Sequence, residues 1–208
     1  MDNPHYGNQW DYSRLLNPSS HLVLKMDNPY YLKYLEANQG GIDAYLQRRS
    51  LVQTYAWAVP DVEVIKLLAS KHPRIVEMGA GTGYWIHLLS LCGIQVEAFD
   101  RFPPHRGSNP YKHNREWYPV KKARLGILKR FQGWTLLLCW PPYSDAMATA
   151  SLRHFGGNKL IYIGENHGGC TGDDTFHNTL YKEWNLIDSH DIPQWDGIHD
   201  RVYEYQRC

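Results

Sequence analysis

The residues with the clearest chemical potential stand between an apolar stretch and a helical pattern. Apolar residues 74–78 run into three glycines at alternate positions, Gly79, Gly81 and Gly83. Glycine allows a sharp backbone turn there, and lets a ligand approach the start of the next helix without meeting a Cβ atom. The carboxyl of Glu77 precedes the first glycine by two residues. This pattern predicts a ligand-binding turn between a strand and a helix.

The glycine spacing distinguishes two kinds of nucleotide site. The dinucleotide fingerprint GxGxxG would need a glycine at position 84, where this chain has Tyr84. An NAD-dependent oxidoreductase is therefore disfavoured. The acidic residue followed by alternate glycines resembles motif I of class I S-adenosylmethionine-dependent methyltransferases. Asp100 ends the next predicted strand, where this family places an acidic residue on the ribose hydroxyls. The resemblance extends over most of residues 55–208.

The resemblance implies a set of cofactor-binding residues and no metal. It places Glu77 near the amino-acid end of S-adenosylmethionine, with the glycines beneath the cofactor. The aromatic segment 55–57 resembles the part of the superfamily that covers the cofactor, and an aromatic face favours a positive sulfonium. The set expected to contact the cofactor is Tyr55, Trp57, Glu77, Gly79, Ala80, Gly81, Gly83, Tyr84, Trp85, Asp100 and Trp140.

A second motif follows the most hydrophobic run of the chain, residues 134–140. Ligands in doubly wound sheets bind beyond the carboxyl ends of the strands, so Trp140-Pro141-Pro142-Tyr143 is expected to face the reacting methyl group. It resembles motif IV of amino-methyltransferases, in which Asp, Asn or Ser precedes Pro-Pro. Trp140 replaces that polar residue. Either the substrate is not an exocyclic base amine, or backbone carbonyls and another residue hold it. Pro141, Pro142 and Tyr143 are predicted catalytic-site residues.

Methyl transfer requires alignment of donor and acceptor, and a protonated acceptor also needs a base. Glu165 closes the fifth predicted strand, where a carboxylate usually faces the crevice of an α/β sheet. It is therefore preferred as a base or substrate anchor over Asp145 and His167.

Alternating strands and helices must position these residues. We expect a Rossmann-like, doubly wound α/β fold with a mostly parallel seven-stranded sheet, a C-terminal antiparallel strand and an N-terminal helical lid. Residues 1–58 are expected to form an arm and the lid, and residues 59–208 the cofactor-binding domain. Strands are predicted at 74–78, 94–100, 117–120, 134–140, 160–164, 186–192 and 202–206; helices are predicted from Tyr30 to Gly40, and at 42–55, 60–71, 84–92, 121–131, 145–155 and 175–184.

Composition limits the binding partners and the cellular compartment that we expect for this protein. Lys and Arg number 22 and Asp and Glu 21, a net charge of +1 that gives no overall attraction to nucleic acid. The four cysteines show no CxxC spacing, no signal peptide is recognised and no apolar run approaches the length of a membrane span. We therefore expect a cytoplasmic protein that does not enter membranes.

The sequence thus favours a methyltransferase of the EC 2.1.1 class, using S-adenosylmethionine and acting on a small or planar metabolite. One alternative is an N-methyltransferase acting on a nucleic-acid base, which draws on the Pro-Pro-Tyr motif and the basic residues within 121–130. The other is a cofactor-binding but inactive subunit that supports a partner. The neutral net charge and Trp140 make nucleic acid the less favoured partner.

Overall fold

Seven strands form one mixed sheet in the order β3-β2-β1-β4-β5-β7-β6. The computed structural model describes residues 28–38, 42–104 and 109–208, so most of the expected N-terminal arm lies outside the described residues. Strands β3, β2, β1, β4 and β5 run parallel, and β7 runs antiparallel to β5 and β6. The strands are β1 Arg74–Met78, β2 Gln95–Asp100, β3 Lys121–Lys122, β4 Thr135–Cys139, β5 Lys159–Gly164, β6 Trp184–Asp191 and β7 Arg201–Arg207.

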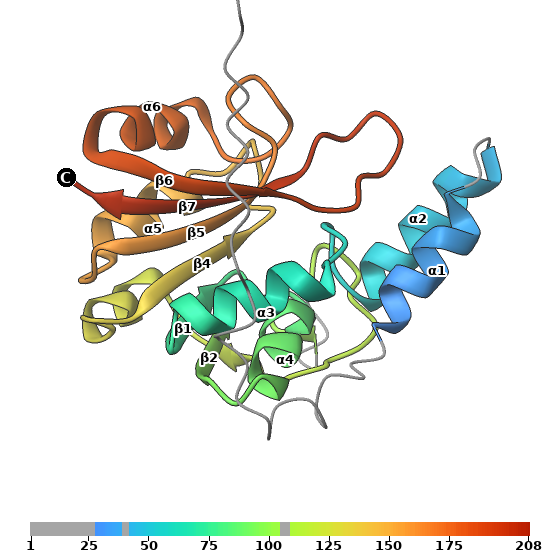
Figure 1. Cartoon of the computed structure of the whole chain (residues 1–208), viewed down its shortest axis with the longest axis horizontal. Helices are drawn as coiled ribbons and strands as arrows, with labels where there is room; N and C mark the ends of the chain where they lie inside the picture. Colours follow the sequence, from blue (N-terminus) through green and yellow to red (C-terminus); the bar gives the residue numbers. More distant parts are fainter. Residues whose placement is uncertain (1–27, 39–41, 105–108) are drawn as a thin grey trace, which may run out of the picture.

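Helices cover both faces of this sheet (Figure 1). They are α1 Pro29–Ala37, α2 Ile42–Thr54, α3 Val62–Lys71, α4 Tyr84–Leu91, α5 Met147–His154 and α6 Asp174–Glu183, with a 3-10 helix, η4, at Leu125–Arg130. The predicted doubly wound fold with a C-terminal antiparallel strand is confirmed. Among the described residues, no helix combines the length and apolar character needed to cross a membrane.

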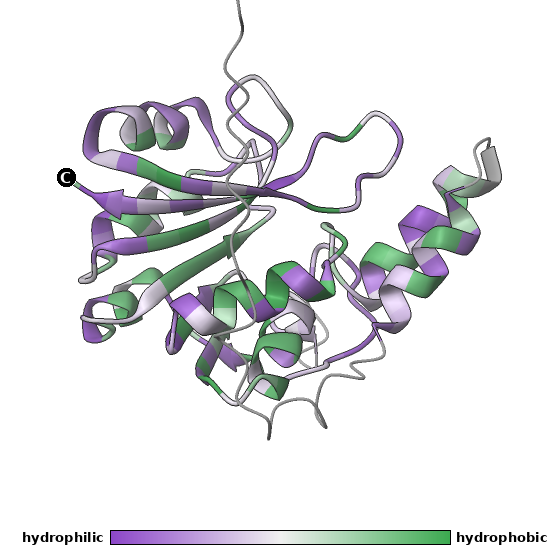
Figure 2. Ribbon diagram, in the orientation of Figure 1, coloured by the Kyte–Doolittle hydropathy of each residue, from purple (hydrophilic) through white to green (hydrophobic). Residues whose placement is uncertain are grey.

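Alternate residues of the central strands build two separate hydrophobic cores. Ile75 and Leu137 pack with α3 and α4 on one face, whereas Val76 and Leu136 pack with α5 and α6 on the other. Successive strand residues point to opposite faces, and a strand covered on both faces is apolar throughout. In Figure 2 the middle parts of β4 and β5 are accordingly coloured as hydrophobic. This explains why residues 134–140 form an unbroken hydrophobic run.

The order of strands reverses between β1 and β4, which are adjacent although β2 and β3 lie between them in sequence. After β1 the chain winds outward to β2 and β3, and then returns to β4 on the other side of β1. Ligands in open α/β sheets bind at such a switch point, beyond the carboxyl ends of the strands. The glycine turn after β1 and the proline turn after β4 therefore meet at one edge.

Two predicted elements in the third quarter of the chain are wrong. The expected strand 117–120 is irregular, because the Trp117 amide donates to the Thr82 carbonyl and its indole to the Thr54 carbonyl. The edge strand is instead Lys121–Lys122, paired with Phe99 and Asp100. The expected helix 121–131 is reduced to η4, which contains a glycine and has no side-chain cap at Arg124.

Aromatic rings join the helical lid to α4, the helix that follows the glycine turn. Tyr30 of α1 stacks on Tyr55, just after α2, with ring centroids 4.9 Å apart. Tyr55 also meets Tyr84 of α4 edge to face at 5.1 Å. The lid ends before α3, whose N-cap is Asp61 rather than the predicted first-turn Pro60. The aromatic contacts place segment 55–57 next to the glycine turn.

Candidate active site

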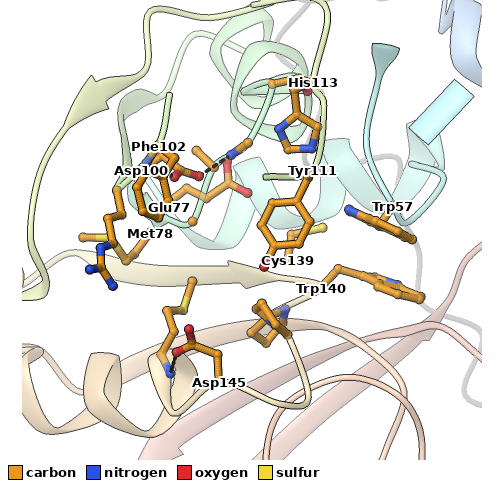
Figure 3. A pocket seen from close by; sticks show the side chains of 18 of the residues that line it. Trp57, Glu77, Met78, Asp100, Phe102, Tyr111, His113, Cys139, Trp140 and Asp145 are labelled. Atoms are coloured by element: carbon orange, nitrogen blue, oxygen red, sulfur yellow. Dashed lines mark hydrogen bonds between the residues drawn. The ribbon is translucent and has the colours of Figure 1, made fainter. Parts of the chain in front are cut away.

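A cavity of about 1140 Å³ lies at the carboxyl ends of β1, β2 and β4. The glycine turn forms one side of it, and the turn after β4 forms another. Figure 3 shows Glu77 and Asp100 on one side and the paired indoles of Trp57 and Trp140 on the other, with Tyr111 between them. The cavity therefore has an acidic end and an aromatic end.

The glycine turn has a backbone that other residues adopt only at a cost. Gly79, Gly81 and Gly83 have φ angles of 78°, 54° and 73°, in the left-handed region that favours glycine. The amides of Gly79 and Ala80 both donate to the Phe99 carbonyl, at 2.8 and 3.1 Å. A Cβ atom on Gly79 would collide with Met147 Cε, and one on Gly81 would lie 2.7 Å from His113 Cε1. Backbone conformation favours glycine at all three positions, and the His113 ring also limits the space at Gly81.

Asp100 fixes this turn from the neighbouring strand. Its Oδ2 accepts a hydrogen bond from the Gly81 amide at 3.0 Å, and its Oδ1 accepts one from the Phe102 amide at 2.7 Å. A carboxylate can accept about four hydrogen bonds in total, so capacity for a ligand remains. Asp100 lines the cavity, and it links the turn after β1 to the turn after β2.

Glu77 is the buried carboxyl of the acidic end. The residue is 2% exposed, it lines the cavity, and its Oε2 has no hydrogen-bond partner among the described residues. Burial, with a further contribution from the charge of Asp100, raises the pKa of Glu77 well above its ordinary value. A buried polar atom without a partner is costly. A ligand that brings an N–H donor or a positive charge to Oε2 would remove that cost.

The aromatic end is built around Trp140, which has a backbone unusual for its type. Its φ is 51°, a left-handed conformation that costs a bulky residue about 1–3 kcal/mol and is concentrated at functional sites. Several contacts hold it: the indole stacks on Trp57 at 4.9 Å, and its Nε1 donates to Asp200 Oδ1 at 2.7 Å. The guanidinium of Arg48 lies 5.7 Å from the Trp57 ring and 5.6 Å from the Trp140 ring.

The proline turn forms a rigid wall beside Trp140. Pro141 and Pro142 both line the cavity. The Pro141 carbonyl accepts from the Gly172 amide at 2.8 Å, and Pro142 pairs with Thr171 in an isolated β-bridge. Tyr143 is 48% exposed and is not among the residues that line the cavity.

Glu165 lies behind the wall rather than in the cavity lining. Its Oε1 accepts from the His199 amide at 2.8 Å and its Oε2 from the Cys170 amide at 2.7 Å. Burial acts to raise the pKa of Glu165, but hydrogen bonds from Cys170 and His199 outweigh burial and lower it. In this position Glu165 anchors two loops near the cavity.

Most of the site residues predicted from sequence line the cavity. Gly83, Tyr143 and Glu165 lie outside its lining. The twelve predicted residues that line it are Tyr55, Trp57, Glu77, Gly79, Ala80, Gly81, Tyr84, Trp85, Asp100, Trp140, Pro141 and Pro142. Tyr84 and Trp85 also support the fold through hydrogen bonds. The Tyr84 hydroxyl donates to Asn28, and the Trp85 indole donates to the Ala58 carbonyl.

Several lining residues gave no signal in the sequence. Tyr111 and His113 come from the irregular segment after β2, and Met147 from the first turn of α5. Burial lowers the pKa of His113, which favours the neutral imidazole. Arg48, whose guanidinium lies over both indoles, and Asp200, which accepts from the Trp140 indole, were also missed, because neither belongs to a local motif.

Comparison with known proteins identifies the fold. No family model matches the sequence, and no curated protein matches it. The structure of a mutant of MtNAS in complex with S-adenosylmethionine has a TM-score of 0.50 at 13% identity, over 90% of this chain and 76% of that one. The mitomycin 7-O-methyltransferase MmcR gives 0.49 at 13% identity, over 84% and 60%. The methyltransferase domain of bacterial CtHen1-C gives 0.47 at 14% identity, over 69% and 94%.

The chain has the class I, Rossmann-like fold of S-adenosylmethionine-dependent methyltransferases. The strand order, the glycine turn after β1 and the acidic end of β2 have the arrangement expected of that fold. The similarity to MtNAS over nine-tenths of the chain agrees with it.

Proposed function

We propose that this protein is an S-adenosylmethionine-dependent methyltransferase acting on a small or planar acceptor. The observation that carries the proposal is Glu77, a carboxyl 2% exposed whose Oε2 has no partner and which lines the cavity beside the glycine turn. A buried carboxyl is stabilised by a cationic donor. The amino group at the amino-acid end of S-adenosylmethionine is such a donor.

The remaining residues at the acidic end fit the rest of that cofactor. Asp100 would accept from the ribose hydroxyls while it holds the Gly81 and Phe102 amides. The absence of a side chain at Gly79 and Gly81 keeps the floor of the cavity open. When bound, S-adenosylmethionine supplies a methyl group on a positively charged sulfur. The indoles of Trp57 and Trp140 line the same cavity, and aromatic faces favour a positive charge.

The wall after β4 would position the acceptor. Pro141 and Pro142 give this wall a fixed shape, and Trp140 is held by Trp57 and Asp200. A displacement at carbon depends mainly on such alignment. Tyr143 and Glu165 remain candidate catalytic residues: Tyr143 would cover the acceptor from the exposed rim, and Glu165 would act through the Cys170 and His199 loops that it holds.

A second candidate is an N-methyltransferase acting on a nucleic-acid base. Three exposed cationic residues, Arg101, Lys122 and Arg124, line the cavity, and such residues contact phosphates. Retention on heparin that falls steeply with salt would favour this candidate. A cofactor-binding but inactive subunit would bind S-adenosylhomocysteine and transfer no methyl group to any acceptor class.

Calorimetric titration with S-adenosylhomocysteine and, separately, with NAD tests the cofactor assignment. We expect micromolar binding of S-adenosylhomocysteine alone. The Glu77→Gln variant removes the charge at nearly constant shape and should weaken this binding about tenfold or more, as expected for loss of a charge-assisted hydrogen bond. Binding of NAD alone, or of neither ligand, would contradict the proposal.

A further inference from the structure

Arg48 presents an unpartnered edge of its guanidinium beside the aromatic end of the cavity. Its Nε and Nη2 atoms are buried and have no hydrogen-bond partner among the described residues. These two nitrogens lie on the same edge of the planar group. Their parallel N–H bonds form the fork with which arginine binds a carboxylate in two places. The residue as a whole is half-buried.

Asp200, which comes immediately before β7, presents a matching unpartnered atom. The residue is 1% exposed, and its Oδ1 accepts from the Trp140 indole. Its Oδ2 is buried without a partner. The charge of Arg48 acts on Asp200, yet the described contacts include no ion pair between them. One edge of the Arg48 guanidinium, which lies over both indoles, and one oxygen of Asp200, which accepts from the Trp140 indole, are thus both buried without a partner.

We propose that Arg48 and Asp200 form an oxyanion site that takes the carboxylate of the methyl acceptor, next to the aromatic end of the cavity. This inference rests on the proposed methyltransferase function. The carboxylate would accept two hydrogen bonds from the Arg48 fork and a third from the protonated Asp200 carboxyl. Trp140 would then stand between the anchored end of the acceptor and the cofactor cavity that its indole lines.

The local charge favours a carboxylate over a phosphate. Arg48 supplies one positive charge, and the carboxylate of Glu165 lies near enough to act on Asp200. A singly charged carboxylate is balanced by one guanidinium, whereas a doubly charged phosphate would leave excess negative charge in a buried place. The planar carboxylate also matches the planar fork.

Protonation of Asp200 should be linked to this binding. Burial, more than any other influence, raises the pKa of Asp200 to about 7. An anion beside Asp200 favours the protonated form, so affinity should rise as the pH falls through that value. The titratable and charged groups that act on Asp200 or are acted on by it are Arg48 and Tyr30 of the lid, Cys139 of β4, Tyr162 of β5, Glu165, Cys170, His199, and Tyr203 of β7.

Calorimetry with benzoate as the probe tests the site. The full chain is titrated with benzoate at pH 6 and pH 8, with and without saturating S-adenosylhomocysteine, and benzamide and inorganic phosphate are titrated in parallel. We expect benzoate to bind more tightly at pH 6 than at pH 8, and more tightly than either other probe. Arg48→Gln should weaken benzoate binding about tenfold or more. Arg49→Gln, which changes the adjacent and exposed arginine of α2, should leave it unchanged.

The Asp200→Asn variant tests whether binding depends on the proton of the Asp200 carboxyl, because it keeps the shape of that side chain. Asparagine keeps an oxygen for the Trp140 indole and adds an N–H donor, so it imitates the protonated acid. This variant should bind benzoate at pH 8 at least as tightly as the wild type does at pH 6, and should lose the pH dependence. Circular dichroism confirms that each variant folds.

Three results would overturn the site: equal benzoate affinity in the wild type and Arg48→Gln, tighter binding of phosphate than of benzoate, or affinity that rises with pH. Binding of S-adenosylhomocysteine without any benzoate binding would reject the oxyanion site and leave the methyltransferase proposal standing. Benzoate binding without S-adenosylhomocysteine binding would reject the methyltransferase proposal and leave the oxyanion site standing.

Discussion

The indole of Trp140 donates a hydrogen bond of 2.7 Å to Asp200, a residue that follows the β6–β7 loop and comes immediately before β7. This bond crosses from the end of β4 to the C-terminal antiparallel strand, and it holds a residue whose φ of 51° is unfavourable for a tryptophan. The wall of the candidate active site therefore depends on a carboxyl that does not itself line the cavity.

Removal of that carboxyl should destabilise the protein. Asp200→Ala leaves the partly buried Nε1 of Trp140 without an acceptor, which should lower the free energy of unfolding by about 1–3 kcal/mol. Urea unfolding followed by tryptophan fluorescence measures the change. Asp200→Asn keeps an acceptor oxygen and should cost less. Equal losses in the two variants would show that the hydrogen bond to Trp140 does not support the fold.

The part of the site that could be predicted from sequence is the part encoded locally. Residues 74–100 contain a strand, a glycine turn, a helix and a second strand in succession, so Gly81 and Asp100 are brought together by one short unit. Arg48 and Asp200 lie far apart in sequence, and each approaches the Trp140 indole only in the folded chain. No local spacing marks such a pair.

The same contrast explains the errors around β3. Residues 117–131 were expected to form a strand and then a basic helix, but Trp117 is taken up by contacts to Thr54 and Thr82. Only Lys121 and Lys122 remain to pair with the edge of β2. Tertiary contacts of one aromatic residue thus outweighed the local preference of the segment.

Substitutions of Gly81, in the glycine turn, and of Gly93, after α4, form a matched pair. Gly81→Ala places a Cβ atom at a φ of 54° and 2.7 Å from His113, inside the cavity. Gly93→Ala meets a similar φ of 79° after α4, with no atom within 4 Å. Both variants should lose about 1–2 kcal/mol of stability. Only Gly81→Ala should also lose affinity for S-adenosylhomocysteine in calorimetry. Equal affinity in the two variants would exclude Gly81 from the cofactor site.

Asp100 should be required for cofactor affinity. Asp100→Ala removes the acceptor of the Gly81 and Phe102 amides together with the proposed ribose contact. We expect S-adenosylhomocysteine affinity to fall about tenfold or more. Tyr143→Ala, at the exposed rim, should keep the affinity and lower methyl transfer. Wild-type affinity in Asp100→Ala would contradict the ribose assignment.

A final prediction concerns the acid stability that β7 gives to the sheet. Glu204 of β7 is 5% exposed and accepts hydrogen bonds from His72 at 2.7 Å, His190 at 2.7 Å and Lys71 at 2.8 Å. Burial acts to raise the pKa of Glu204, but hydrogen bonds from His190, His72 and Lys71 outweigh burial and hold it far below the ordinary value. Its contribution to stability is therefore fully present above the unfolded pKa of about 4.3, and is lost as the pH falls below that value towards the folded pKa.

Urea unfolding between pH 3 and pH 6 measures this contribution. The wild type should lose stability steeply below about pH 4.3, and Glu204→Gln should be less stable at pH 6 and show a shallower slope. Glu183→Gln, which changes an exposed carboxyl at the end of α6, should keep the wild-type slope. If the slopes of the wild type and Glu204→Gln coincide, the three partners of Glu204 do not stabilise its charged form, and the acid sensitivity of the fold must come from other carboxyls.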